Sequence, residues 1–269
     1  MICNKENVRV ELNKLLSAIF ALEEIDCVKI RDIEIRNDAR REEKVEEALE
    51  ESYHDCYSDV DLAVVVKLSP KETITQAQYM KRIDRFGFGR ENCLGILFVE
   101  ENSMYRIVQK NGIRYDFGFH FVCDDSAKKI SMEPERQYYD NPKWPVENID
   151  RFWFIQVQAL GKLYRNDFLI GDHLANMGLN ETLVQQMVLR DIQHNTNHHR
   201  YGYSEKPVYL KTGNGCPYKT DNEVFNLIAD KLYCAALAYD ELAVPFYPEY
   251  EKRSPVYFEI WESYEQGKK

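Results

Sequence analysis

Asp59 and Asp61 are separated by one residue at the start of an apolar run that ends in Val64-Val65-Val66. The run predicts a strand buried on both faces, and side-chain alternation along a strand places both carboxylates on one face. Two like charges on one face repel each other unless a divalent cation lies between them, as in sites of phosphoryl and nucleotidyl transfer. The simpler alternative is a polar strand entrance with two solvated aspartates.

A third acidic candidate, Asp116, comes from a predicted β-hairpin. Asn111-Gly112 is a strong signal for a two-residue turn, and it separates strand-like stretches at 105–110 and 113–122. Asp116 lies in the second stretch among aromatic and apolar neighbours, where an unpaired carboxylate costs free energy. We therefore expect a partner for this side chain.

Two kinds of partner are compatible with Asp116. The carboxylate pairs with Arg114 or a backbone donor, or it joins Asp59 and Asp61 at a metal ion. His120 falls on the same face of the predicted strand. We interpret it as a packed histidine and not as a ligand.

The composition is that of a globular chain with an acidic balance. Of 269 residues, 44% are hydrophobic and 30% are charged, and the formal net charge is -10. This charge argues against binding to a nucleic-acid backbone. It suits a small cationic partner, and it is equally explained by general solubility.

The sequence predicts a cytoplasmic protein. Its seven cysteines are scattered and form no CxxC pair, which indicates reduced thiols and not a disulfide framework. No apolar run approaches the ~18 residues of a membrane span, and the N-terminus lacks a signal-peptide pattern. We expect no membrane and no nucleic-acid partner, and a monomer or a homodimer.

The patterning changes near the middle of the chain and predicts an α+β protein of two domains. We expect an N-terminal domain at 1–130 with a mixed sheet and flanking helices, a proline-bearing linker at 131–148, and a helical domain at 149–269.

Apolar spacing predicts the elements inside each domain. In the N-terminal half we expect helices near 5–26 and 71–86 and strands near 28–35 and 94–99. The strand pattern slips at Arg31-Asp32, which predicts a β-bulge. The charged stretch 38–51 predicts an exposed helix or a mobile loop. In the C-terminal half the expected helices are 152–164, 168–177, 181–201 and 223–242.

Two weaker motifs have simple structural explanations. His194 and His198 share a face of an expected helix, with His199 beside them, yet no acidic or cysteine partner stands at a standard metal-ligand spacing. Gly87-Phe88-Gly89 lacks the third glycine of a phosphate-binding loop, so a helix-ending turn is the better interpretation.

The motifs together resemble a known group. Ser58-Asp59-Val60-Asp61-Leu62, followed by valines and a lone aspartate on a later strand, resembles the nucleotidyltransferase superfamily of the DNA polymerase beta type. The C-terminal half is similar to the streptomycin-type aminoglycoside 6-adenylyltransferases. The similar stretches, in shared order, are Pro134-Glu135-Arg136-Gln137-Tyr138, Phe152-Trp153, Ala159-Leu160-Gly161-Lys162-Leu163-Tyr164-Arg165, Gly171-Asp172-His173-Leu174, the glycine loop ending in Tyr218-Lys219, and Tyr247-Pro248-Glu249-Tyr250.

The resemblance implies a nucleotidyltransferase domain followed by a helical bundle that binds the acceptor. It implies Mg2+-dependent transfer of AMP from ATP to a hydroxyl of a small cationic, aminoglycoside-like acceptor, an activity that gives antibiotic resistance. Asp59 and Asp61 would hold the metal, and Asp116 would complete the metal site or accept the proton of the acceptor hydroxyl. The candidates for binding the nucleotide are Ser58, Arg165 and Lys219.

The chain departs from this family at the phosphate-binding positions. The family has a Gly-Ser pair after its first strand, and the nearest counterpart here is Asn37-Asp38, whose carboxylate would repel phosphate. Cys216 stands where the glycine loop of the family has lysine, and Leu189 stands where a helix of the family has tryptophan. The alternative function is therefore a protein that binds a nucleotide or a small cationic ligand without turnover.

Overall fold

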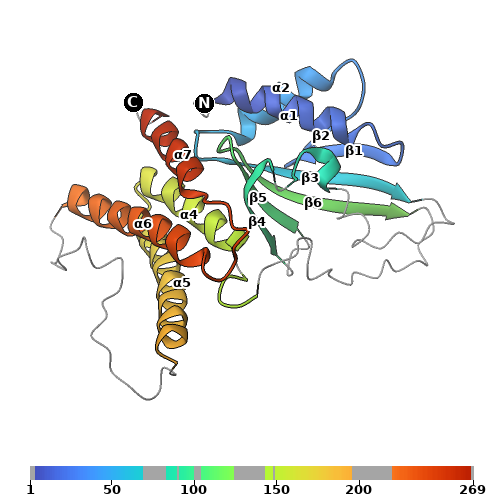
Figure 1. Ribbon diagram of the computed structural model, residues 1–269. Coiled ribbons are helices and arrows are strands. Elements are labelled where there is room, and N and C mark those ends of the chain that lie inside the picture. Colours follow the sequence, from blue (N-terminus) through green and yellow to red (C-terminus); the bar gives the residue numbers. More distant parts are fainter. Residues whose placement is uncertain are drawn as a thin grey trace. The chain divides into compact units, whose positions relative to one another are not determined.

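The chain folds into two compact units in the computed structural model, Met1–Asp140 with Lys269, and Asn141–Lys268. The structure describes residues 4–68, 83–89, 91–99, 104–123, 143–147, 149–195 and 220–267. Figure 1 shows a sheet with helices in the first unit, and helices in the second. The expected α+β class is confirmed. Most of the predicted linker at 131–148 lies outside the described residues.

The first unit is built around a six-stranded mixed sheet of order β2-β1-β3-β6-β5-β4. The central strands β3 and β6 run parallel, and the other neighbouring pairs are antiparallel. The expected hairpin between β5 and β6 is present, but its loop has three residues, Lys110 to Gly112, and not two, because the N–H of Gln109 donates to the carbonyl oxygen of Ile113. Gly112 ends the loop with a positive φ of 87°. The strands are β1 (Ile25–Ile30), β2 (Ile33–Ile35), β3 (Asp59–Leu68), β4 (Cys93–Val99), β5 (Met104–Gln109) and β6 (Arg114–Cys123).

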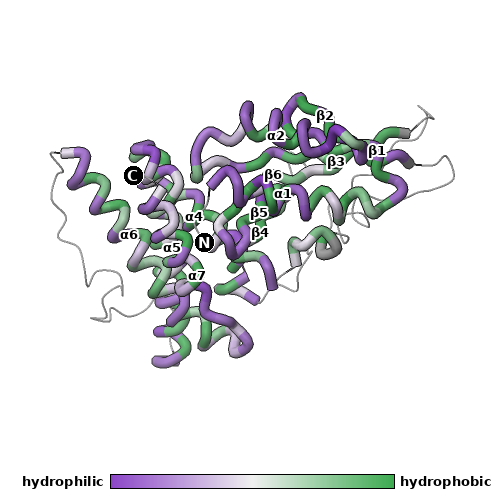
Figure 2. Tube along the Cα trace, turned by 90° about the horizontal axis from the view of Figure 1, so that it is seen from above, coloured by the Kyte–Doolittle hydropathy of each residue, from purple (hydrophilic) through white to green (hydrophobic). Residues whose placement is uncertain are grey.

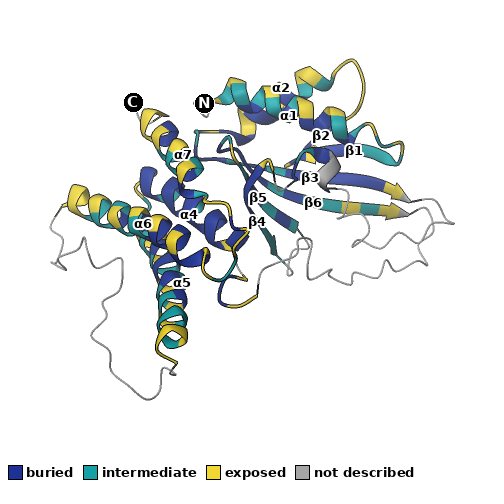
Figure 3. Ribbon diagram, viewed as in Figure 1, coloured by how far each residue is buried: buried dark blue, intermediate teal, exposed yellow. Residues whose placement is uncertain are grey.

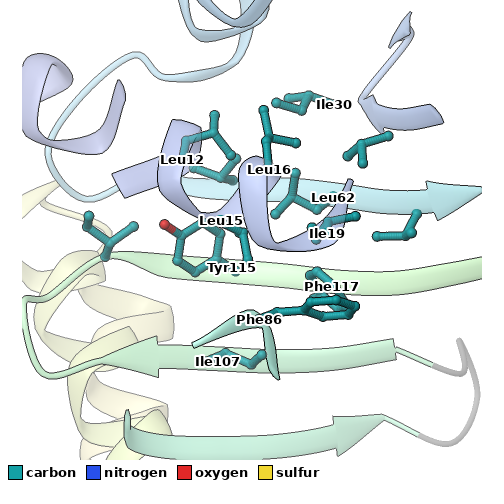
Figure 4. Packing of buried hydrophobic residues seen from close by; sticks show 14 of the residues in the cluster. Leu12, Leu15, Leu16, Ile19, Ile30, Leu62, Phe86, Ile107, Tyr115 and Phe117 are labelled. Atoms are coloured by element: carbon teal, nitrogen blue, oxygen red, sulfur yellow. The ribbon is translucent and has the colours of Figure 1, made fainter. Parts of the chain in front are cut away.

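Helices α1 (Lys5–Ile19) and α2 (Arg41–Ser52) share a hydrophobic core with one face of this sheet. The 3-10 helix η1 (Ile83–Phe86) adds to the core and ends at Gly87, whose φ is 83°, so the glycine stretch there is a helix-ending turn as expected. Figure 4 shows the buried side chains of α1 next to those of the strands, among them Leu12, Leu16, Ile19, Ile30, Leu62 and Phe117.

One prediction for the first unit needs correction, and one open alternative is decided in favour of a helix. Arg31-Asp32 is the two-residue turn of a hairpin between β1 and β2, closed by the pair Ile30 and Ile33, and not a bulge. The apolar pattern slips there because the chain reverses direction. The stretch predicted as an exposed helix or a mobile loop is helix α2, which buries Val45 and Leu49 and exposes its charged side chains.

The described residues of the second unit form helices that pack around α4. In Figure 2 the helices carry hydrophilic and hydrophobic residues in turn, as expected of amphipathic helices. Figure 3 shows α4 mostly buried and the later part of α5 more exposed. None of the helices in the described part of the chain combines the length and the apolar composition that a membrane crossing requires. The helices are α4 (Ile149–Tyr164), α5 (Phe168–His194), α6 (Asp221–Ala243) and α7 (Ser254–Gly267).

The helices predicted separately at 168–177 and 181–201 are one continuous helix, α5. The predicted gap between the two helices contains Gly178, but this glycine is needed for the packing of α5 against α4. A Cβ atom at Gly178 would lie 2.0 Å from Nε2 of Gln156, a fully buried side chain of α4. The glycine therefore lets α5 approach α4 closely without ending the helix.

Candidate active site

Asp59, Asp61 and Asp116 lie on one face of the two central strands. The parallel register pairs Asp61 with Asp116, and it pairs Asp59 with Arg114. The intervening Val60 is buried in the core beneath α1 and α2, so the aspartates lie on the opposite face of the sheet. Side-chain alternation predicted the shared face of Asp59 and Asp61, and the register brings Asp116 to them.

The face of β3 that carries the aspartates is open at its start. The side chains of Asp59 and Asp61 are 45% and 50% exposed, whereas Val65 further along the same face is 5% exposed. The prediction of a strand buried on both faces is therefore wrong at the carboxylates, because no helix among the described residues of the first unit covers them. This opening leaves the carboxylates accessible to a ligand.

Each of the three carboxylates lies beside one arginine. The nitrogen–oxygen distance in each of these pairs exceeds the ~2.7–2.9 Å of a charge-assisted hydrogen bond. The arginines therefore balance the charge of the site without fixing the carboxylates in one conformation. The nitrogen–oxygen distances are 3.9 Å for Arg31–Asp61, 3.4 Å for Arg106–Asp116 and 3.8 Å for Arg114–Asp59.

Burial raises the pKa of Asp116 to about 6, since its side chain is only 13% exposed. The charge of Arg106 opposes this rise in pKa, and the charges of Asp59 and Asp61 add to it. The pKa of Asp61 is also raised, first by burial and then by Asp59, against the opposing effect of Arg31. The carboxylates are thus close enough to disfavour one another's charge.

Arg114 fixes the entrance of β3. This arginine is 5% exposed, and its Nη2 donates a hydrogen bond of 2.6 Å to the carbonyl oxygen of Tyr57. In the same turn, Oδ1 of Asp55 accepts from the backbone N–H of Tyr57 at 2.9 Å and from the hydroxyl of Ser58 at 3.0 Å. Arg114 and Asp55 therefore hold the turn that sets the position of Asp59.

Arg31 lies beside Asp61 because the pairing of β1 with β3 places Ile30 opposite Leu62. Its φ of 50° is in the left-handed region, which costs a residue other than glycine ~1–2 kcal/mol. Nη1 of Arg31 also donates to the carbonyl oxygen of Glu51 at 3.4 Å. Sequence reasoning missed this residue as part of a site. Its signal was the phase slip, which marks a turn but not the strand that the turn adjoins.

Asn37-Asp38, the expected counterpart of the Gly-Ser pair, lies near the other end of the sheet. The preceding Arg36 is 3.6 Å from Asp26, which also pairs with Lys67 at 2.7 Å. Lys67 lies six residues further along β3 than Asp61, which is roughly 20 Å at ~3.3 Å per residue. The expected alignment is therefore wrong, because the turn after β1 adjoins the carboxylates and the loop after β2 does not.

The donor set of the site fits Mg2+ by its chemistry. Carboxylate oxygens are the ligands that this hard cation prefers, and a cation would offset the mutual repulsion that helps raise the pKa of Asp61 and Asp116. Among the described residues, no three acidic, histidine or cysteine side chains already meet at one point in this conformation. The carboxylates would have to turn from their arginines to share one ion.

The three predicted nucleotide-binding residues have different positions. Ser58 is 9% exposed, and its hydroxyl donates to Asp55, so it serves the turn before β3. Arg165 is exposed in the turn after α4, in the second unit. Lys219 lies outside the described residues. A role in nucleotide binding stays a prediction for all three.

The histidines do not add a ligand to the carboxylates within the described chain. His120 is exposed, so its interpretation as a packed histidine is wrong. It lies on the same face of β6 as Asp116, four residues further along the strand. His194 is exposed at the end of α5, and His198 and His199 lie outside the described residues.

Neither a scan against protein-family models nor a search of curated proteins finds a match to this chain.

Proposed function

We propose that this protein is a nucleotidyltransferase that moves a nucleoside monophosphate from a nucleoside triphosphate to a hydroxyl of a small acceptor. One observation carries the proposal: Asp59, Asp61 and Asp116 share an open face of two adjacent parallel strands, with Asp61 opposite Asp116. Three carboxylates that disfavour one another's charge are a costly arrangement in a free protein. A cationic ligand makes the arrangement favourable.

Asp59 and Asp61 are the proposed ligands of Mg2+, since they are the two more exposed carboxylates. The bound ion would offset the charge of the triphosphate and favour in-line attack on it. Asp116 either completes this ligand set or accepts the proton of the acceptor hydroxyl. A pKa of about 6 suits proton transfer near neutral pH.

The resemblance supports ATP as the nucleotide and an aminoglycoside-like compound as the acceptor, and the net charge of -10 favours a cationic acceptor. The helical second unit would bind this acceptor. Such an enzyme would act in the cytoplasm, where ATP is available, as a monomer or a homodimer, and would give antibiotic resistance.

A second candidate is a protein that binds the nucleotide or a cationic ligand without turnover. The observation in its favour is that each carboxylate faces an arginine, which opposes the binding of a second cation. The absence of a Gly-Ser pair next to the aspartates also favours binding without turnover.

Two measurements on the purified chain separate these candidates. Calorimetry with ATP and MgCl2 measures binding, and release of pyrophosphate over a panel of aminoglycosides measures transfer. The enzyme releases pyrophosphate with at least one acceptor, and Asp61→Asn abolishes the release. The binding protein takes up Mg·ATP and releases none with any acceptor.

Asp26→Asn is the matched control, because Asp26 pairs with Lys67 near the far end of β3. It removes one carboxylate from the same sheet and should leave both readouts within about twofold of wild type, a difference well under ~1 kcal/mol. If the wild type binds no Mg·ATP, the proposed function is overturned.

A further inference from the structure

Arg31 adopts a backbone conformation that its residue type does not favour. It is the first residue of the two-residue turn that joins β1 to β2, with the pair Ile30 and Ile33 on either side. Its φ of 50° lies in the left-handed region, where glycine or asparagine is the usual residue. An arginine at such a position indicates that its side chain has a use that offsets the backbone strain.

The side chain of Arg31 is held loosely beside the carboxylates. Its Nε lies 3.9 Å from Oδ2 of Asp61, and its Nη1 donates to the carbonyl oxygen of Glu51 at 3.4 Å. Both distances lie beyond the ~2.9 Å typical of such hydrogen bonds, and the side chain is 48% exposed. The guanidinium can therefore move from Asp61 to a ligand with little loss of favourable interaction energy.

The other two arginines of the site are less exposed than Arg31. Arg114 is 5% exposed and bound to the carbonyl oxygen of Tyr57. The side chain of Arg106 is 33% exposed and lies opposite Asp116 in the pairing of β5 with β6. Of the three, Arg31 is the one at the open edge of the site.

We propose that Arg31 binds the phosphates of a nucleoside triphosphate whose metal ion is held by Asp61 and its neighbours. The inference rests on the proposed function. A ligand that replaces Arg31 on Asp61 must carry anionic groups within reach of the released guanidinium. Phosphate oxygens match its planar fork of N–H donors. Arg31 thus makes the site specific for metal-bound polyphosphates.

The test compares wild type with Arg31→Gly, which removes the side chain and suits the positive φ, so that the variant folds at least as well. Arg36→Ala is the matched control. It removes a similarly exposed arginine, 52% exposed, from the same β1–β2 hairpin at the far end of the sheet. Calorimetry measures binding of Mg2+ alone and of Mg·ATP, and a thermal scan measures stability.

The inference predicts changes of opposite sign for the two ligands. Arg31→Gly should bind Mg2+ alone more tightly, because the cation competing for Asp61 is gone. It should bind Mg·ATP roughly 10- to 100-fold more weakly, because one or two charge-assisted hydrogen bonds to the phosphates are lost. Arg31→Lys, which keeps the charge without the fork, should fall between wild type and Arg31→Gly.

The outcomes are distinct. If the wild type binds Mg·ATP and Arg31→Gly binds it equally well or better, the inference is overturned while the proposed function stands. If Arg36→Ala weakens Mg·ATP binding as much as Arg31→Gly does, the effect is one of net charge and the inference is again overturned. If the wild type binds no Mg·ATP, the inference and the proposed function are both overturned.

Discussion

Asp61 lies directly opposite Asp116 in the parallel pairing of β3 with β6. Residues paired across parallel strands point to the same face, so backbone register alone keeps these carboxylates close. Arg106 and Arg114 offset part of the repulsion at Asp116, but burial outweighs them and the pKa of Asp116 rises to about 6. The charge of the site therefore changes just below neutral pH.

Asp116→Asn should remove a pH dependence of stability from the metal-free protein. The pKa of Asp116 in the folded state is about 6, against ~3.9 for an unfolded aspartate. The folded state therefore binds this proton more tightly, which stabilises it at low pH, and the stabilisation is lost as the pH rises through 6. A difference of ~2 pKa units corresponds to roughly 3 kcal/mol at most.

Urea unfolding in EDTA at pH 5 and pH 7 measures this effect. The free energy of unfolding of wild type relative to Asp116→Asn should be greater at pH 5 than at pH 7. The comparison with the variant cancels the carboxylates outside the site, whose titration both proteins share. Equal differences at the two pH values would show that Asp116 titrates normally.

Asp59→Asn and Asp61→Asn should both abolish transfer but differ in stability. Asp61 faces a half-exposed arginine, so its neutralisation relieves repulsion from Asp59 and the thermal midpoint without metal should hold or rise. Asp59 faces Arg114, which is 5% exposed and would lose its counter-ion. We expect Asp59→Asn to cost about 1 kcal/mol more than Asp61→Asn.

Thermal scans in EDTA and pyrophosphate-release assays test this pair of variants. The double variant Asp59→Asn/Arg114→Met serves as a control for the Asp59–Arg114 pair. It is compared with Arg114→Met alone, which loses the hydrogen bond to Tyr57. The loss of stability in the double variant should be smaller than the sum of the two single losses if an uncompensated guanidinium contributes to the effect of Asp59→Asn. Retention of full transfer activity by either single variant would exclude that aspartate as a metal ligand.

The sequence predicts the strands of the site and indicates Arg114, but it does not indicate Arg31 or Arg106. Apolar alternation identifies β3 and β6, and the Asn-Gly turn identifies the β5–β6 hairpin, because both signals are local. Arg31 and Arg106 reach the carboxylates from β1 and β5 through the register of separate strand pairs. Register depends on the whole sheet, so no local pattern reveals these contacts.

The two errors in the helical and phosphate-binding regions have different physical origins. The sequence predicts two helices, 168–177 and 181–201, with Gly178 in the gap between them, and it places Asn37-Asp38 after the first strand. In the structure, Gly178 is explained by its contact with Gln156 of another helix. The first strand ends earlier, at Ile30, where the chain turns back on itself. The packing of Gly178 depends on a neighbour distant in sequence, whereas the turn at Arg31-Asp32 is local and its phase slip was interpreted as a bulge.

Tyr250→Phe should destabilise the second unit. The Tyr250 hydroxyl accepts from Nε1 of Trp153 at 3.0 Å and donates to Oδ1 of Asp240 at 2.6 Å, and all three residues are buried. Burial raises the pKa of Tyr250, so the hydroxyl keeps its proton at working pH. Its removal leaves the buried indole N–H without this partner, which we expect to cost roughly 1–3 kcal/mol.

Chemical denaturation followed by tryptophan fluorescence measures this loss. Tyr233→Phe is the matched control, because Tyr233 lies on α6 and is 50% exposed. It should change the free energy of unfolding by less than ~0.5 kcal/mol. Equal stability of Tyr250→Phe and wild type would show that the hydroxyl contributes nothing net.

Asn37→Gly/Asp38→Ser, a change that would create a Gly-Ser pair, should leave nucleotide binding unaltered. Asp38 follows β2, and the neighbouring Arg36 lies beside Asp26 near the far end of the sheet from Asp61. Over roughly 20 Å of strand, about twice the ~8–10 Å Debye length near physiological salt, the charge of Asp38 is screened from a bound triphosphate. The double variant should therefore match wild-type affinity for Mg·ATP within about twofold.

The same variant should change the start of α2 only slightly. Oδ1 of Asp38 accepts from the backbone N–H of Arg40 at 2.8 Å, and serine can replace that acceptor. Calorimetry with Mg·ATP, with Arg31→Gly measured in parallel, distinguishes the two candidate phosphate-binding turns. If the double variant binds Mg·ATP tenfold more tightly, the loop after β2 faces the phosphates. The placement of the nucleotide at the β1–β2 turn would then be wrong.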